Sequence, residues 1–281
     1  MHGLNISEFT GFIFLGALAA GFFGSMTGLG GGVIIVPLLT LIFGVDIRYA
    51  AGASLVSVIA TSSGAAAAYV REGFSNIRVA MFLEVATTIG ALSGAFLAAR
   101  LQTSVISIIF GAVLLFSAYF SRKPPKNISG PEKTDRIAAL LKMDSSYPAG
   151  GSFRHYNVAG VPAGFGIMYV AGVVSGLLGI GSGALKVLAM DRAMRLPFKV
   201  STTTSNFMIG VTAAASAGVY LNRGYIDPAL AMPVMLGVLT GSAIGARVLV
   251  KAQVRSIRLL FLAVLIVLAV EMIYNGVTGR L

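Results

Sequence analysis

The sequence predicts an all-α integral membrane protein with about eight long hydrophobic segments in two pseudo-symmetric halves. The chain is 56% hydrophobic and only 11% charged, with a mean hydropathy of +0.87. Soluble domains carry about 25% charged residues. The apolar runs are continuous and mostly long enough to span a hydrocarbon core of about 30 Å, unlike the short alternating segments of a membrane β-barrel. The chain is therefore expected to be an integral membrane protein with several crossings.

The apolar runs differ in length. Most hold about 20 residues, which suits one membrane-spanning helix each. Two are too long for a single untilted helix, and each has a glycine cluster in its middle. The first run follows an N-terminus without a basic region, so we expect it to be a retained helix. The runs lie at 9–43, 48–70, 77–99, 103–121, 159–190, 200–220, 228–250 and 257–275.

An internal repeat relates the two halves. Residues 21–101 align with residues 172–252 without an insertion, and 15 of the 81 pairs are identical, among them Thr61 with Thr212. A duplicated half built around a glycine break is typical of membrane transporters. We therefore expect a first transmembrane repeat at 1–121, a polar basic linker at 122–158 and a second repeat at 159–281. Within the linker, Ile137 to Met143 has a weak pattern for a short surface helix.

The glycine clusters should interrupt their helices, because each glycine costs about 1 kcal/mol of helix stability relative to alanine. Non-helical backbone at membrane depth is tolerated only inside protein or along a wet cavity. The breaks are therefore predicted to bind substrate, and the alternative is close helix packing through glycine. The residues concerned are Gly28, Gly30, Gly31 and Gly32 in the first half and Gly179, Gly181, Ser182 and Gly183 in the second.

The breaks also affect the predicted topology. If both long runs cross once, the Lys and Arg residues other than Lys186, which lies inside an apolar run, divide 11 to 9 between the two sides. If both runs enter, turn at the glycines and return, the division becomes 16 to 4, with the linker on the basic side. The positive-inside rule favours the second arrangement, which makes the halves inverted repeats with a cytoplasmic linker and both termini outside.

Two ionisable residues fall inside apolar segments. Lys186 follows the second glycine cluster, and Glu84 lies in the third segment. Charges at membrane depth are costly and mark functional sites by default. Lys186 could attract an anion, or its long side chain could reach the interface. Glu84 could relay protons, or it could form an interfacial salt bridge with Arg78. The sequence leaves each of these alternatives open.

Polar uncharged residues cluster at the beginning of the helices that follow the breaks. Helix N-termini offer unpaired N–H groups, and hydroxyl and amide groups add donors for a small oxyanion. The alternative is helix capping and bonding of hydroxyls back to the helix. Their symmetric placement in the two halves favours a binding role for Ser54, Thr204, Ser205 and Asn206.

Several functions are excluded by composition. The chain has no cysteine and only two histidines, so no thiolate metal site, histidine cluster or catalytic triad is expected. Nucleotide-binding and hydrolase motifs are missing, which predicts neither an enzyme nor a cofactor. The net charge of +11 is explained by basic cytoplasmic loops rather than by nucleic-acid binding. The expected partners are a small anionic substrate and the lipid bilayer, and the oligomeric state stays open.

The glycine motifs resemble those of the TauE/SafE family of sulfite-exporter and toluenesulfonate-permease-like transporters. The resemblance rests on Gly28-Leu29-Gly30-Gly31-Gly32 followed by Val36-Pro37, on a second copy at 179–187, and on the pairs Ala53-Ser54 and Thr204-Ser205. It covers nearly the whole chain and implies movement of sulfur oxyanions or organosulfonates across the bacterial inner membrane. Ser182 and Leu188 depart from the first copy, so the resemblance does not specify the substrate.

The sequence thus predicts a secondary transporter of a small sulfur-containing oxyanion or organosulfonate. The alternatives are an exporter of another small organic acid and a passive anion channel. A membrane scaffold is a third class, but a scaffold has no use for broken helices and a lysine at membrane depth.

Overall fold

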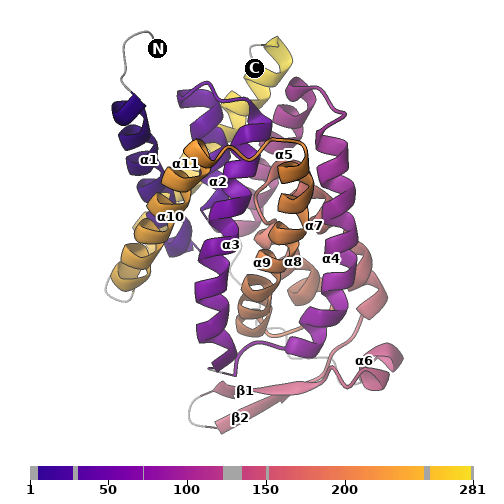
Figure 1. The fold of residues 1–281 in the computed structure, drawn as a ribbon. Coiled ribbons are helices and arrows are strands. Elements are labelled where there is room, and N and C mark those ends of the chain that lie inside the picture. Colours follow the sequence, from indigo (N-terminus) through magenta and orange to yellow (C-terminus); the bar gives the residue numbers. More distant parts are fainter. Residues whose placement is uncertain are drawn as a thin grey trace.

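The computed structural model is a bundle of helices with a small hairpin at one end (Figure 1), and it describes residues 6–27, 31–71, 73–122, 135–149, 152–249 and 254–279. The first half begins with one long helix, a short helix and a π-helical turn. Three long helices follow. These elements are α1 (Ile6–Thr27), α2 (Gly32–Pro37), η1 (Leu38–Ile42), α3 (Ile47–Arg71), α4 (Ile77–Ala98) and α5 (Thr103–Arg122).

The second half repeats this order. From α8 onward each element begins 151 residues after its counterpart, so the offset found in the sequence is also the offset of the helix starts. Both π-helical turns occupy equivalent positions. The elements are α7 (Val161–Leu178), α8 (Gly183–Leu188), η2 (Ala189–Ala193), α9 (Phe198–Asn222), α10 (Pro228–Leu249) and α11 (Val254–Thr278).

The linker contains strands that the sequence did not predict. The expected short helix is present as α6 (Arg136–Leu140), but it is followed by an antiparallel hairpin of β1 (Ser145–Ala149) and β2 (Ser152–Tyr156), with Ser145 opposite Tyr156. The all-α prediction is therefore wrong for this segment. Its short polar strands lack the apolar alternation that marks a half-buried sheet.

Glycine lets helices of opposite halves approach closely. A Cβ atom at Gly241 of α10 would lie 2.0 Å from the carbonyl oxygen of Leu18 in α1. Equivalently, a Cβ atom at Gly176 of α7 would lie 2.0 Å from the carbonyl oxygen of Ala91 in α4. Only glycine permits such backbone contact. Each half therefore packs its first helix on the third long helix of the other.

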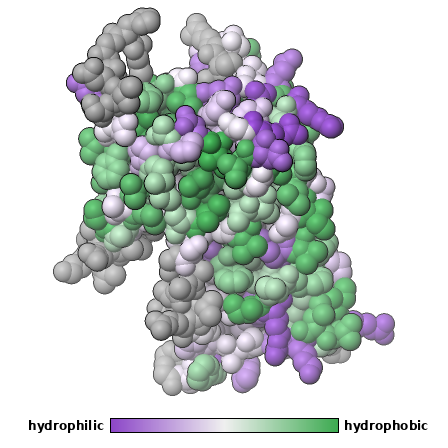
Figure 2. All heavy atoms as spheres, in the orientation of Figure 1, coloured by the Kyte–Doolittle hydropathy of each residue, from purple (hydrophilic) through white to green (hydrophobic). Residues whose placement is uncertain are grey.

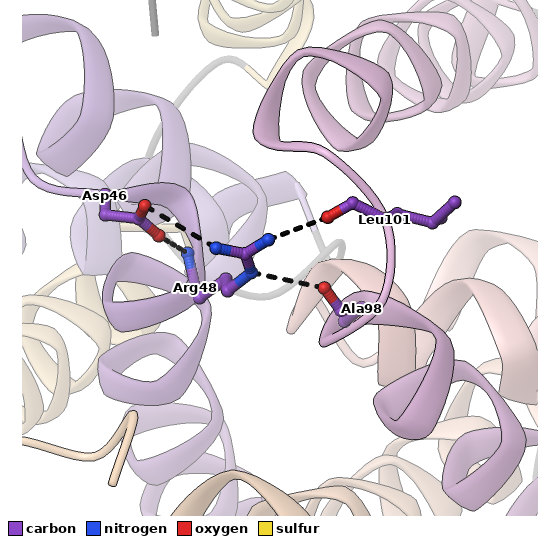
Figure 3. A network of polar contacts seen from close by, with 4 residues as sticks. All are labelled: Asp46, Arg48, Ala98 and Leu101. Atoms are coloured by element: carbon purple, nitrogen blue, oxygen red, sulfur yellow. Dashed lines mark hydrogen bonds and ion pairs between the residues drawn. The ribbon is translucent and has the colours of Figure 1, made fainter. Parts of the chain in front are cut away.

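The contacts also give the directions of the helices. Gly90 and Gly94 of α4 meet Tyr169 and Val173 of α7 in the same order, so these two helices run parallel. The start of α3 lies beside the end of α4, because Arg48 donates hydrogen bonds to carbonyl oxygens there (Figure 3). The beginning of α1 and the end of α11 lie at one end of the bundle, and the hairpin lies at the other (Figure 1).

The outer surface of the bundle suits a lipid environment. Exposed apolar residues follow helical spacing along α4, at Met81, Val85, Ile89 and Phe96. Figure 2 shows hydrophobic side chains over the middle of one face and hydrophilic ones toward its ends. Among the described helices, three are long and apolar enough to cross a membrane, within Ile77–Ala98, Val161–Leu178 and Pro228–Gly245. The chain is a multi-pass membrane protein, and the number of eight segments stays a prediction.

Candidate functional site

The glycine breaks interrupt both long apolar runs. Between α7 and α8 the backbone turns through Gly179 and Gly181, with φ angles of 70° and 72°, and through Ser182, with a φ of 44°. Positive φ values are readily adopted by glycine and uncommon for other residues. In the first half the interruption lies between α1 and α2, and Gly28 and Gly30 fall outside the described residues.

The two breaks lie against each other inside the bundle. A Cβ atom at Gly32, the first residue of α2, would lie 3.4 Å from the Cα of Ile180 in the second turn. It would also lie 2.7 Å from the hydroxyl of Ser54. Gly31 has a different neighbour, since a Cβ atom there would meet Val238 of α10 at 2.8 Å. The start of α2 is therefore in contact with the turn between α7 and α8.

Two serines predicted to bind substrate hold the backbone of the second break. Ser54 of α3 donates a hydrogen bond to the carbonyl oxygen of Gly179 at 2.7 Å. Its repeat partner, Ser205 of α9, donates one to the carbonyl oxygen of Gly183 at 3.3 Å. Both serines are fully buried. The hydroxyl proton of Ser54 is thus donated to a carbonyl group just past the end of α7, and that of Ser205 to the carbonyl group of the first residue of α8.

The other three polar residues that were predicted to bind substrate differ in their contacts. Ser182 donates to the carbonyl oxygen of Ala171 in α7 at 2.6 Å. Thr204 accepts a 3.0 Å hydrogen bond from the backbone N–H of Asn76, in the loop before α4, so it joins α9 to that loop. Asn206 is half-buried and forms no hydrogen bond with another residue in the described part of the chain. Of these three, Asn206 is the one whose side chain is not engaged by another described residue.

A chain of hydrogen bonds joins the two ionisable candidates. Nζ of Lys186 in α8 donates to Oγ1 of Thr212 in α9 at 2.5 Å. Oγ1 of Thr212 lies 2.7 Å from Oε1 of Glu84 in α4, to which it donates. Thr88 also donates to Oε1 of Glu84, at 3.3 Å. The structure thus brings together a cation and an anion that are 102 positions apart in the sequence.

Both charges are buried, which decides two alternatives that the sequence left open. Lys186 is fully buried, so its side chain does not reach the interface. Glu84 is 8% exposed and does not pair with Arg78, whose guanidinium donates instead to the carbonyl oxygen of Lys142 at 2.7 Å. Buried charges are stable only when they are paired and hydrogen-bonded, and Thr212 supplies the connection.

The carboxylate is only partly satisfied. Oε2 of Glu84 is buried and has no hydrogen-bond partner in the described part of the structure. A buried acceptor without a partner costs about 1–3 kcal/mol, more when it is charged. Because Oε2 of Glu84 belongs to a carboxylate that is connected to a buried lysine, it marks a position where another proton or ligand could bind.

The sequence did not single out Thr212 as a functional residue. The available signal was its identity with Thr61 in the repeat, one of only 15 identical pairs. The same repeat gives no help for its partners, because Lys186 aligns with Ile35 and Glu84 aligns with Met235. The charged network therefore joins residues of both halves and has no symmetric counterpart in the repeat.

A helical bundle with apolar outer stripes and a charged pair in its interior belongs to the class of multi-pass membrane proteins that handle polar solutes. Residues 13–272 match the family model described as Sulfite exporter TauE/SafE, so the chain belongs to the TauE/SafE family of membrane transporters. This confirms the resemblance seen in the sequence. The family consists of transporters rather than enzymes.

Curated relatives cover nearly the whole chain. "Probable membrane transporter protein YunE" of Bacillus subtilis is 27% identical over 92% of this chain and 96% of its own length. "Probable membrane transporter protein ORF9" of a Sinorhizobium species is 24% identical over 93% of this chain and 91% of its own. A relative in Methanocaldococcus jannaschii, also described as a probable membrane transporter, is 23% identical over 90% of this chain and 91% of its own. No solved structure matches the chain significantly.

Proposed function

We propose that this protein is a gradient-driven transporter of a small sulfur-containing oxyanion or organosulfonate, with Lys186 as the positive charge that attracts the substrate. The observation that carries the proposal is the fully buried Lys186 beside the glycine breaks. A lysine inside a membrane bundle is costly and by default marks a substrate or ion pathway. The family description names sulfite as a substrate of the family, which supports the choice of a sulfur oxyanion.

In this proposal the glycine breaks and the free amide of Asn206 complete the binding site. Anion sites commonly combine one cation with backbone N–H groups and neutral donors. Ser54 and Ser205 act by holding the turn between α7 and α8, since their protons are donated to its carbonyl oxygens. Gly28 and Gly30 remain predicted contacts of the same kind.

We further propose that the two halves are inverted repeats, with the linker in the cytoplasm and both termini outside. The 16-to-4 division of Lys and Arg residues supports this orientation. The direction of the helices supports it as well. The start of α3 lies beside the end of α9, because Arg48 stacks on Tyr225, and the start of α9 lies beside the end of α3, because Lys199 stacks on Phe74, so these two repeat-equivalent helices run in opposite directions.

The burial of Lys186 favours a carrier over a passive anion channel. A channel needs a continuous open path, whereas a carrier opens its site to one side at a time. Export of another small organic acid remains the alternative within the transporter class, because a lysine and an amide do not distinguish a sulfonate from a carboxylate.

The test is transport by the purified protein in liposomes, with labelled sulfite, sulfate, thiosulfate, taurine, methanesulfonate and sulfoacetate as candidate substrates. Lys186→Met keeps the apolar stem and removes the charge, so we expect substrate affinity to fall about ten- to hundred-fold. Lys186→Arg keeps the charge in a different geometry and should retain part of the affinity. Thermal stability measured in parallel separates binding from folding. Unchanged affinity in Lys186→Met would refute the role of this charge.

A further inference from the structure

The network of Lys186, Thr212 and Glu84 contains one hydroxyl proton and two acceptors for it. The hydroxyl of Thr212 accepts from Lys186 and lies 2.7 Å from Oε1 of Glu84 and 2.9 Å from the carbonyl oxygen of Met208. A hydroxyl donates only one hydrogen bond at a time. Thr212 can therefore serve Glu84 or the backbone of its own helix, but not both.

The charges of Lys186, Glu84 and a bound anion sum to zero in only some combinations of anion binding and protonation. With the site empty, Lys186 and ionised Glu84 sum to zero. A monovalent anion bound at Lys186 would leave a net charge of −1 inside the membrane. The sum returns to zero if Glu84 is protonated at the same time. Because an unbalanced charge in the membrane interior costs several kcal/mol, the neutral combinations are the ones that can change conformation.

From this balance we propose that the protein moves one proton together with each monovalent anion, that Glu84 carries the proton, and that Thr212 couples its uptake to anion binding at Lys186. The proposal rests on the proposed function, since it assumes that Lys186 receives the anion. Transport of a monovalent anion is then electroneutral, and its direction follows the sum of the anion and proton gradients.

The coupling follows from the geometry. Thr212 is the hydrogen-bond partner of Lys186 Nζ in the described part of the chain, and an anion that binds the remaining donors of Nζ compensates the positive charge that Thr212 connects to Glu84. When the hydroxyl turns to the carbonyl oxygen of Met208, Oε1 of Glu84 loses its shorter hydrogen bond. Oε2 already has no partner among the described residues. The carboxylate then takes up a proton from the aqueous side at one oxygen, which forms one O–H bond and removes the unpaired charge.

No other charged side chain reaches Glu84 from the described parts of the helices that pack on α4. On α7 the single titratable residue is Tyr169, which is 40% exposed. On α9, Lys199 and Tyr220 lie near opposite ends, and Tyr220 donates to carbonyl oxygens of α7. This leaves Lys186 of α8 as the charge connected to Glu84.

On η2, which follows α8, Asp191 and Arg192 form an ion pair with each other at 3.4 Å. Within α4 itself, Arg78 donates to the linker. Among the described residues, the charge balance at this site therefore involves only Lys186 and Glu84.

The experiment uses the full chain in liposomes with methanesulfonate as the probe, because its single negative charge does not change with pH. Three measurements separate the steps. Exchange of labelled for unlabelled probe at equal pH reports binding and conformational change alone. An inward proton gradient of about one pH unit, at zero membrane potential, should accumulate the probe about tenfold. A membrane potential without a pH gradient should accumulate none.

The variants assign the roles. In Glu84→Gln the occupied site is neutral and the empty site is positive, so exchange should persist while accumulation by the pH gradient falls to about onefold. Thr212→Val should likewise lose most of the accumulation, and Thr212→Ser, which keeps the hydroxyl, should retain it. Thr61→Val is the matched control, because Thr61 is the repeat counterpart of Thr212 and, among the described residues, its hydroxyl donates within its own helix.

The outcomes distinguish the two proposals. Absence of exchange in the parent protein, with sulfite as well as with methanesulfonate, would contradict the proposed function. Exchange without accumulation by a pH gradient would leave that function intact and overturn the proton coupling. Accumulation in Glu84→Gln equal to that of the parent would overturn the role of Glu84. Equal loss in Thr212→Val and Thr61→Val would overturn the role of Thr212.

Discussion

The guanidinium carbon of Arg48 lies 5.9 Å from the centre of the Tyr225 ring, and the repeat counterparts of these residues make the same kind of contact. Nζ of Lys199 lies 3.7 Å from the centre of the Phe74 ring. In both pairs a cation at the start of one half's long helix stacks on an aromatic residue in the other half's loop. The repeat is therefore conserved in tertiary contacts as well as in helix boundaries.

The two contacts differ in strength, which gives a first prediction. Arg48 also donates hydrogen bonds to the carbonyl oxygens of Ala98 at 3.2 Å and Leu101 at 2.7 Å (Figure 3). Arg48→Met should lower the free energy of unfolding by about 1–3 kcal/mol. Lys199→Met removes the stacking alone and should cost about 0.5–1 kcal/mol. Thermal unfolding in one detergent compares them, and equal shifts would show that the carbonyl contacts contribute nothing.

The topology can be tested without a substrate. We expect a reporter fused after Leu281 to be outside the cell and reporters inserted within 126–145 to be cytoplasmic. The physical reason is the 16-to-4 division of basic residues, which favours retention of the linker side in the cytoplasm. Paired reporters that are active on opposite sides of the membrane provide the measurement. A cytoplasmic C-terminus would contradict the inverted repeats.

The second glycine turn should be intolerant of a side chain. Gly181 has a φ of 72°, and a Cβ atom there would lie 2.8 Å from Cγ2 of Ile209. Gly181→Leu should abolish exchange transport in liposomes while the protein still inserts, because the side chain strains the turn and fills the space beside it. Gly218→Ala in α9 is the control, since a Cβ atom there meets nothing within 4 Å. Transport at the parent rate in Gly181→Leu would exclude a binding role for the turn.

The repeat made much of the fold predictable. Its offset of 151 residues is also the offset between the starts of α2 and α8, and both glycine clusters fall where the helices are interrupted. The hairpin of β1 and β2 was missed because its pairing is stabilised by contacts with the loop before α4 rather than by an alternating pattern of its own.

The candidate site was predictable only in part. Lys186 and Glu84 stood out individually, because a charge in an apolar segment is visible in the sequence. Their connection depends on how α4, α8 and α9 pack, and no spacing along the chain encodes that contact. The hydrogen-bond partners of the hydroxyl groups could not be predicted from the sequence either. Ser205 and Thr204 are adjacent, yet one contacts Gly183 and the other contacts Asn76.

Asn76 joins the linker to the transmembrane helices, which leads to a prediction about stability. Its side chain accepts from the N–H of Val79 at 3.0 Å and donates to the carbonyl oxygen of Met143 and the hydroxyl of Tyr156, both at 2.8 Å. Asn76→Ala leaves buried groups unpaired and should cost about 2–4 kcal/mol. Its repeat counterpart Asp227 only caps its own helix, so Asp227→Ala should cost about 1 kcal/mol in the same unfolding assay. A smaller loss of unfolding free energy in Asn76→Ala than in Asp227→Ala would contradict the role of Asn76 in joining the linker to the transmembrane helices.

The phenol of Tyr156 gives this junction a dependence on pH. Burial raises the pKa of Tyr156 above its ordinary value of 10.0, and its hydrogen bond with Asn76 opposes this only in part. Because the folded state holds the phenol proton more tightly than the unfolded chain does, the resulting stabilisation is complete below pH 10 or so and is lost as the pH rises through the higher folded value. Unfolding midpoints of the parent should therefore fall more steeply above about pH 10 than those of Tyr156→Phe, which has no proton to lose. At neutral pH the same variant should lose only about 1 kcal/mol, the contribution of one hydrogen bond. Identical pH profiles for the two proteins would show that Tyr156 ionises in the folded state as easily as in the unfolded chain, and that its burial at the junction does not hold the proton.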